Sequence, residues 1–137
     1  FSPDLFIIKS LIVGAYTLAE LRRRIERYEP YVNAFITDTY DPASGASGAT
    51  GKRHDWQVSS ALSRYSRWPV LLAGGLTVNN VAQAISTVRP AGVDVHTGVE
   101  DCSGRKEADL VVRFIDAARN ALAESDSADS TTTTQRG

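Results

Sequence analysis

Glycines that follow two short apolar runs are the residues of this sequence that best fit a binding site. Gly74 and Gly75 follow the run at residues 71–73, and Thr97 and Gly98 follow a second run further along the chain. A strand that leads into a helix through glycines leaves the first helical N–H groups unpaired, so that an anion can approach the backbone closely. Two such strand ends could share one phosphate group, although a simple tight turn explains Gly74 and Gly75 equally well.

Two acidic side chains lie at or near the ends of predicted strands. Asp38 lies near the carboxyl end of the apolar run at residues 32–39, and Asp94 lies within the run at residues 92–97. In parallel α/β folds the loops at the carboxyl ends of the strands converge on one face, where catalytic groups collect. Asp38 is therefore a candidate catalytic acid, with turn capping as the alternative. An unpaired carboxylate is costly to bury, so we expect Asp94 to face a polar site or a structural partner.

A long glycine-rich loop is expected at residues 40–53, directly after Asp38. Loops of this length are usually functional, and this one would cover the candidate acid. The segment GATGK at residues 48–52 lacks the spacing of a nucleotide-binding P-loop. His54 and His96 are far apart and have no partner at metal-ligand spacing, so we expect neither a metal nor a cofactor.

Strand-like and helix-like segments alternate four times along the chain. Apolar runs predict strands at residues 5–13, 32–39, 69–73 and 92–97. Amphipathic patterns predict helices at residues 17–29, from 55 to about 65, from 77 to about 89, and at 107–123. The predicted helix caps are Thr17, whose spacing to Glu20 is that of a capping box, Asp55 and Thr77. Short connections between alternating strands and helices predict right-handed βαβ units and a parallel sheet.

Four βα units make half of a (β/α)8 barrel, which is an α/β fold. Residues 1–124 are expected to hold these units, and the Ser-, Thr- and Asp-rich residues 125–137 to form a disordered tail. A short helical turn is expected between Glu100 and Arg105, after the fourth strand. The three arginines at residues 22–24 are expected to lie on a solvated helix face rather than to bind a polyanion.

Composition and charge narrow the range of partners. The formal net charge of −1 gives no electrostatic reason to expect nucleic acid or an anionic membrane as a partner. No apolar run approaches the ~18 residues of a membrane span, and a signal peptide is not recognisable. The single Cys102 cannot form an intrachain disulfide, which fits the reducing cytoplasm as the location. Because the chain starts at Phe1 and contains no methionine, we expect it to be a piece of a longer protein.

Three parts of the sequence resemble the phosphoribosylanthranilate isomerase family of tryptophan biosynthesis. FITDT at residues 35–39, with GATGK at 48–52 and HDW at 54–56, is similar to that family's Asp-Thr, Gly-x-Gly-Lys and Phe-Asp-Trp segment. LAGGL at residues 72–76 resembles its seventh barrel unit, and VDVHTGVE at residues 93–100 resembles its eighth. The resemblance covers most of the chain and implies the carboxyl half of a (β/α)8 barrel.

The resemblance implies an isomerase that acts on a small phosphorylated sugar, N-(5′-phosphoribosyl)anthranilate. In this Amadori rearrangement Asp38 would protonate the furanose oxygen and open the ring to a Schiff base. A second group would remove the C2′ proton, and the enolamine would tautomerise to the ketone. The phosphate would be held by backbone N–H groups, and Asp94 would orient the substrate hydroxyls. The residues expected to hold the phosphate are Gly74, Gly75, Thr97 and Gly98.

Three features depart from the family pattern. The family's general base is a cysteine in a Lys-x-Cys-Gly motif on the first strand; this motif is absent, and Cys102 cannot take its role. The first four units are absent, and His96 stands where the family usually has a small serine, so that it would crowd the phosphate or donate to it. If the chain is complete, we expect little isomerase activity from it alone. The alternative is a non-catalytic half barrel that binds a sugar phosphate and pairs with itself, as a homodimer, or with a partner half through its sheet edges.

Overall fold

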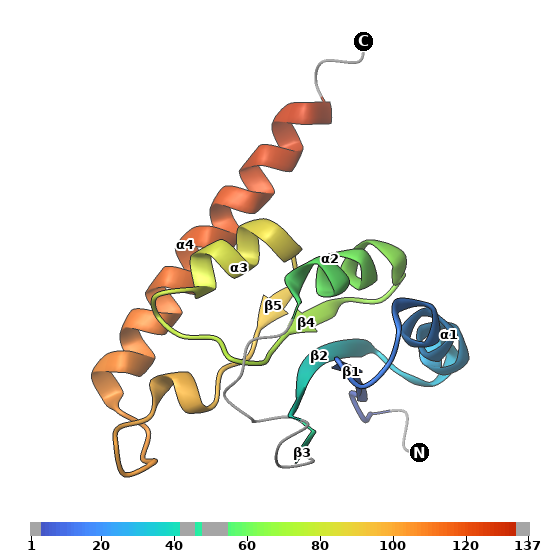
Figure 1. Ribbon diagram of the computed structural model, residues 1–137. Helices are drawn as coiled ribbons and strands as arrows, with labels where there is room; N and C mark the ends of the chain where they lie inside the picture. The colour runs from blue at the N-terminus through green and yellow to red at the C-terminus, as the bar shows by residue number, and fades with distance from the viewer. Residues whose placement is uncertain (1–3, 42–45, 48–54, 134–137) are drawn as a thin grey trace.

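Four parallel strands form the sheet of this protein (Figure 1). The computed structural model describes residues 4–41, 46–47 and 55–133. The strands are β1 (Ile8–Val13), β2 (Ala34–Asp41), β3 (Ala46–Ser47), β4 (Val70–Leu72) and β5 (Gly92–Val93). The α-helices are α1 (Leu18–Tyr28), α2 (Trp56–Tyr65), α3 (Val81–Val88) and α4 (Ala108–Thr133), and the short 3-10 helices are η1 (Glu29–Tyr31) and η2 (Thr97–Val99).

The parallel strands lie in the order β1-β2-β4-β5, and an α-helix follows each of them along the chain. This arrangement confirms the predicted α/β fold of four βα units. In the register of the sheet Phe35 of β2 lies opposite Val70 of β4, and Leu71 lies opposite Gly92 of β5. Because the strands are parallel, the carboxyl ends of β2, β4 and β5 lie at one edge of the sheet, where the predicted site residues are found.

Part of the segment predicted to be a loop, residues 40–53, is strand. β2 continues through Tyr40 and Asp41, which pair in antiparallel orientation with Ser47 and Ala46 of β3. Threonine and tyrosine favour extended backbone, which explains why β2 is longer than its apolar run. Residues 42–45 and 48–53, and with them the predicted cover over Asp38, lie outside the described residues.

Two clusters of buried side chains hold the helices against the sheet. The first joins β1, β2, β4, α1 and α2 through Leu11, Val13, Leu21, Ile25, Val32, Phe35, Leu62 and Val70. The second joins β4, α2, α3, α4 and η2 through Trp56, Leu72, Leu76, Val81, Ala84, Ile85, Val88, Val99, Phe114, Ala118 and Ala121. Phe35 and Leu72 are fully buried, and burial of such a side chain stabilises the fold by about 1.5–3 kcal/mol. These clusters fix β2 and β4, the strands that lead to the candidate site.

Two predicted elements near the candidate site have different boundaries in the structure. Helix α3 begins at Val81 with Asn80 as its N-cap, so the prediction of Thr77 as the cap is wrong. The side chain of Asn80 binds the turn at residues 75–77 instead, which keeps this turn out of the helix. Strand β5 ends at Val93, so Asp94 lies beyond the strand and not within it, although its N–H still donates to the Leu72 carbonyl at 2.9 Å.

The segment after β5 also differs from the prediction. The short helical turn is η2 at Thr97–Val99 rather than a turn between Glu100 and Arg105. The later segment is instead a tight turn organised by the carboxylate of Asp101, which accepts hydrogen bonds from the N–H groups of Ser103 and Arg105. Such Asx-type bonding favours turns over helix, and Gly104 adopts a φ of 78° here.

Helix α4 is longer than its apolar stripe. The sequence predicts an end at Ala123 and a disordered tail from residue 125, whereas the helix continues to Thr133 and projects beyond the rest of the fold (Figure 1). The helix therefore extends past the residue at which the tail was expected to begin. Its Ser, Thr and Asp residues are weak helix formers, but no Gly or Pro occurs before the helix ends. None of the helices in the described part of the chain is long and apolar enough to cross a membrane.

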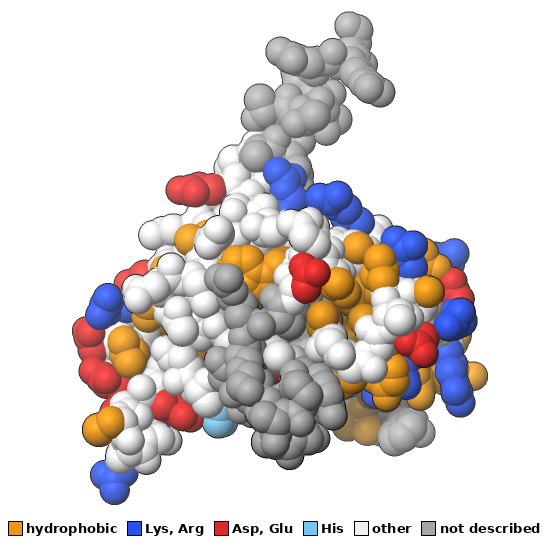
Figure 2. All heavy atoms as spheres, viewed as in Figure 1, with side chains coloured by type: hydrophobic (Ala, Val, Ile, Leu, Met, Phe, Trp, Pro, Cys, Tyr) orange, Lys and Arg blue, Asp and Glu red, His pale blue; other side chains and the backbone are white. Residues whose placement is uncertain are grey.

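Basic side chains gather on the side of the molecule formed by α1 (Figure 2). Arg22 and Arg23 are exposed, as predicted for a solvated face. Two of the arginines also stack on aromatic rings: the guanidinium of Arg24 lies 3.7 Å from the centre of the Tyr16 ring, and that of Arg22 lies 5.0 Å from the centre of the Tyr65 ring. Cation–π contacts therefore give these side chains fixed neighbours without a polyanion.

The predicted capping box begins helix α1. The N–H of Glu20 donates to the Thr17 hydroxyl at 3.3 Å, and the N–H of Thr17 donates to the Glu20 carboxylate at 2.8 Å. The Thr17 hydroxyl also donates to this carboxylate at 2.8 Å. These hydrogen bonds lower the pKa of Glu20 below its ordinary value, with the backbone N–H of Thr17 as the main cause.

The capping box predicts a pH dependence of stability. Because the pKa of Glu20 is lowered in the folded protein, its stabilising effect is complete above the ordinary value of 4.5 and is lost as the pH falls through the folded value. Urea unfolding of the Glu20→Gln variant should therefore show a smaller loss of unfolding free energy between about pH 6 and pH 3 than the parent chain. Glu124→Gln, on the exposed face of α4, is the matched control and should titrate like the parent.

Candidate active site

One pocket lies at the carboxyl ends of β2, β4 and β5, with a volume of about 100 Å³. It is lined by Asp38, Ala73, Gly74, Gly75, Leu76, Asp94, His96 and Thr97. Six of the seven residues that sequence analysis singled out are among these, although they come from three strand ends. Gly98, the seventh, does not line the pocket. The parallel sheet thus brings the candidate acid and the candidate phosphate-binding backbone into one cavity.

The turn after β4 presents backbone N–H groups to the pocket. Gly74 and Gly75 have φ values of 95° and 65°, a conformation that residues with a side chain rarely adopt. Within the described part of the chain, no acceptor binds the N–H groups of these two glycines. Unpaired N–H groups beside a cavity are suited to an anion such as a phosphate.

Asn80 fixes the shape of this turn and was not singled out from the sequence as a site residue. Its side-chain oxygen accepts the N–H of Thr77 at 2.8 Å, and its side-chain nitrogen donates to the Gly75 carbonyl at 2.9 Å. The two hydrogen bonds join the glycine turn to Asn80, the residue directly before α3. The preference of asparagine for N-cap positions is the signal that would have found it.

Gly98 connects the two halves of the pocket by close backbone packing. A Cβ atom at this position would lie 1.8 Å from the Leu76 carbonyl oxygen and 3.1 Å from the Thr77 Cα. Only a residue without a side chain leaves room for this approach. Gly98 therefore sets the spacing between η2 and the glycine turn, rather than facing the cavity itself.

Asp38 and Asp94 place two carboxylates in the pocket. Asp38 is half-buried near the end of β2, where its carboxylate accepts the N–H of Thr39 at 2.8 Å. This bond joins two neighbouring residues of β2, and the carboxyl group lies at the wall of the cavity. Asp94 is exposed, just beyond β5. A carboxyl group in a partly buried pocket is suited to donate or accept a proton.

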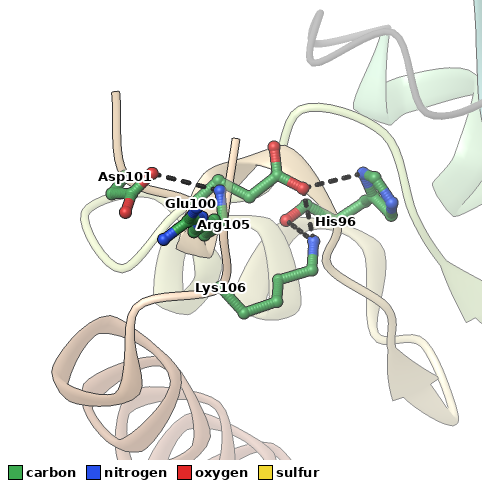
Figure 3. A network of polar contacts seen from close by, with 5 residues as sticks. All are labelled: His96, Glu100, Asp101, Arg105 and Lys106. Carbon is green, nitrogen blue, oxygen red and sulfur yellow. Dashed lines mark hydrogen bonds and ion pairs between the residues drawn. The ribbon is translucent and has the colours of Figure 1, made fainter. Parts of the chain in front are cut away.

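His96 enters the pocket from a loop that is tied together by charged side chains (Figure 3). Its Nδ1 lies 3.4 Å from Oε1 of Glu100, and the same oxygen accepts a hydrogen bond from the Lys106 ammonium at 2.7 Å. Lys106 also donates to the backbone carbonyl of His96 at 2.7 Å. Glu100 and Lys106 were not recognised from the sequence, because their contact depends on how the turn between them folds back.

The same turn holds Asp101 by several hydrogen bonds. The hydroxyl of Ser103 donates to its carboxylate at 2.6 Å, and backbone N–H groups add two further bonds. These bonds lower the pKa of Asp101, the Ser103 hydroxyl being the largest cause. Over residues 4–41, 46–47 and 55–133, no group of three or more His, Cys, Asp or Glu side chains is placed to hold a metal ion.

Residues 4–117 match the family model of N-(5′-phosphoribosyl)anthranilate (PRA) isomerase. The chain belongs to this family. It is 39% identical over 119 residues to N-(5′-phosphoribosyl)anthranilate isomerase 2 of Methanosarcina mazei, covering 86% of this chain and 51% of the relative. It is 45% identical over 122 residues to the isomerase of Haloferax volcanii, covering 88% of this chain and 54% of the relative. The chain thus spans about half the length of the curated relatives that it matches.

Solved structures of the family have the same fold over this region. The phosphoribosylanthranilate isomerase of Pyrococcus furiosus matches with a TM-score of 0.64 and 31% identity, covering 86% of this chain and 52% of that chain. An isomerase in complex with reduced 1-(o-carboxyphenylamino)-1-deoxyribulose 5-phosphate matches with a TM-score of 0.62 and 28% identity, covering 85% and 50%. The family resemblance and the barrel-type fold inferred from the sequence are confirmed.

The packing of Gly98 predicts a selective effect of a methyl group. Gly98→Ala forces η2 away from the glycine turn, because the clash is with a backbone carbonyl that cannot rotate away. We expect this variant to lose about 1–3 kcal/mol of unfolding free energy and to bind phosphate more weakly. Gly92→Ala is the control, since its Cβ would meet only the flexible end of Leu71 at 3.1 Å. Equal losses in the two variants would contradict the assigned role of Gly98.

The hydrogen bonds of Asn80 predict a second effect on the pocket. Asn80→Ala removes both bonds to the turn, so phosphate affinity, measured by isothermal titration, should fall together with about 1 kcal/mol or more of unfolding free energy. Asn80→Asp keeps the acceptor for Thr77 but loses the donor to the Gly75 carbonyl, and it adds a negative charge. Asn80→Asp should be more stable than Asn80→Ala, but it should bind phosphate no more tightly.

Proposed function

We propose that this chain carries the catalytic acid and the phosphate-binding part of an N-(5′-phosphoribosyl)anthranilate isomerase, acting in the cytoplasm. The observation that carries the proposal is the single pocket that holds Asp38 beside the glycine turn at Gly74 and Gly75. The isomerase family supplies the reaction class, and the ligand in a related isomerase structure is a phosphorylated, ring-opened sugar. Donors for a phosphate and an acid a short distance away are what such a substrate requires.

In the proposed reaction the substrate phosphate binds the N–H groups of Gly74 and Gly75, beside Thr97. The close contact of Gly98 with the Leu76 carbonyl sets the spacing of this site. Asp38 gives its proton to the furanose ring oxygen, the C1′–O bond breaks and the ring opens to a Schiff base. Removal of the C2′ proton by a second group gives an enolamine, which tautomerises to the ketone as C1′ gains a proton and the C2′ hydroxyl loses one. Asp94 holds the substrate hydroxyls between these two ends. The phosphate contacts position the ring so that the acid reaches its oxygen.

The pocket is smaller than a site for the whole substrate. Small-molecule sites usually enclose about 300–1,000 Å³, against about 100 Å³ here. We propose that barrel units like those in the unmatched half of the relatives, on the same polypeptide or on a partner chain, complete the wall opposite Asp38. A second copy of this chain is another candidate for that role, and an isomerase from Thermotoga maritima with a TM-score of 0.65 is described as dimeric.

Replacement of Asp38 tests the function. The chain is joined to the part of the Haloferax volcanii isomerase that it does not match, and turnover is followed by the loss of substrate fluorescence. Asp38→Asn keeps the shape of the side chain but carries no transferable proton, so kcat should fall by about 10²- to 10⁴-fold.

Asp116→Asn, on the exposed face of α4, is the matched control and should leave kcat unchanged. Phosphate binding, measured separately by isothermal titration, should survive in Asp38→Asn. Full turnover in Asp38→Asn would show that Asp38 is not the catalytic acid. An inactive parent that still binds phosphate would leave a sugar-phosphate-binding module and would refute the isomerase proposal.

A further inference from the structure

His96 is the pocket residue whose part in the proposed reaction is not yet defined. It lines the cavity together with the glycine turn, while 59% of its side chain is exposed. We propose that His96 is a proton-dependent donor to the substrate phosphate, and that Glu100 and Lys106 are the residues that position it. This inference rests on the proposed function, because it concerns the same phosphate site.

The position of the imidazole is set by two connected contacts (Figure 3). Oε1 of Glu100 lies between Nδ1 of His96 and the ammonium of Lys106. Lys106 also donates to the backbone carbonyl of His96, so this one cation contacts both Glu100 and the backbone of the histidine. Only 16% of the Glu100 side chain is exposed, which reduces its freedom to turn away. The imidazole is therefore oriented before any ligand binds.

The contact with Glu100 determines what the other ring nitrogen can do. A carboxylate beside Nδ1 favours the proton on that nitrogen, so in neutral His96 the second nitrogen, Nε2, is an acceptor. An acceptor cannot form a hydrogen bond with an oxygen of a phosphate dianion, which carries no proton. When the ring is protonated, Nε2 becomes a donor and the side chain gains a positive charge. Among the described residues Nε2 has no hydrogen-bond partner, so it is free to take an anion at the pocket.

The charges around the pocket make this proton important for anion binding. Asp38 on β2 and Asp94 after β5 line the same cavity and repel an anion when ionised. Lys106 is the cation nearest to Glu100, but its ammonium is engaged by that carboxylate and by a carbonyl. The other charged groups of the loop are Asp101, which is bound within its own turn, and Arg105. Protonated His96 is thus the cationic group that lines the cavity among the described residues.

A pH titration with sulfate tests this role. Phosphate changes its own charge with a second pKa near 6, whereas sulfate remains a dianion across the range in which histidine titrates, so only the protein changes protonation. In the barrel completed as above, sulfate affinity should fall about threefold to tenfold between about pH 5.5 and pH 8, since an exposed, charge-assisted hydrogen bond is lost. In His96→Gln, which cannot be protonated, the affinity should be lower and should lose this pH dependence.

Variants of the two positioning residues separate their role from simple charge. Lys106→Met removes the cation that holds Glu100 and the His96 carbonyl, so sulfate should bind more weakly and its affinity should depend less steeply on pH. Lys106→Arg should recover part of the affinity and part of the pH dependence. Arg105→Met removes a positive charge from the same turn without touching His96 or Glu100, and it should match the parent. Glu100→Gln frees the tautomer of His96, so that the neutral ring can donate through Nε2; the pH dependence should then become shallower.

The outcomes distinguish this inference from the proposed function. For the substrate, His96→Gln should raise KM at pH 6 while kcat stays within about twofold, because a phosphate contact is made equally in the ground state and in the transition state. A His96→Gln variant with the sulfate affinity and pH profile of the parent would overturn the inference, even if the isomerase is active. An inactive parent that shows the His96-dependent sulfate profile would support the anion site and refute only the isomerase.

Discussion

The contact between Gly98 and the carbonyl of Leu76 is the constraint on which the rest of the site depends. A side chain at residue 98 would overlap this carbonyl at 1.8 Å, so the two segments approach to the limit set by their backbones. One segment carries the glycine turn and the other carries His96 and Thr97. Their fixed separation gives one cavity, instead of two unrelated loop ends at the edge of a sheet.

Much of this arrangement could be predicted from local signals. The spacing of Thr17 and Glu20 identified a capping box, and the four apolar runs identified the four strands of a parallel sheet. The parallel orientation in turn placed Asp38 on the same edge as Gly74, far away in sequence. Such inferences succeed because a cap or a strand end depends mainly on a few neighbouring residues.

The features that the sequence did not predict depend on contacts between segments. Thr77 has the residue type of a cap, but the side chain of Asn80 reaches back to Gly75 and moves the start of the helix. Glu100 and Lys106 meet only because the turn around Asp101 reverses the chain. The extension of α4 depends on the absence of a stop signal, which a stripe of apolar residues does not report.

The two clusters of the interior meet at β4, which contributes Val70 to the first and Leu72 to the second. Asp38 extends from β2, whose Phe35 belongs to the first cluster, whereas the glycine turn and η2 are held by Leu76 and Val99 of the second. Because β4 belongs to both clusters, loosening of either one would move the glycine turn relative to Asp38.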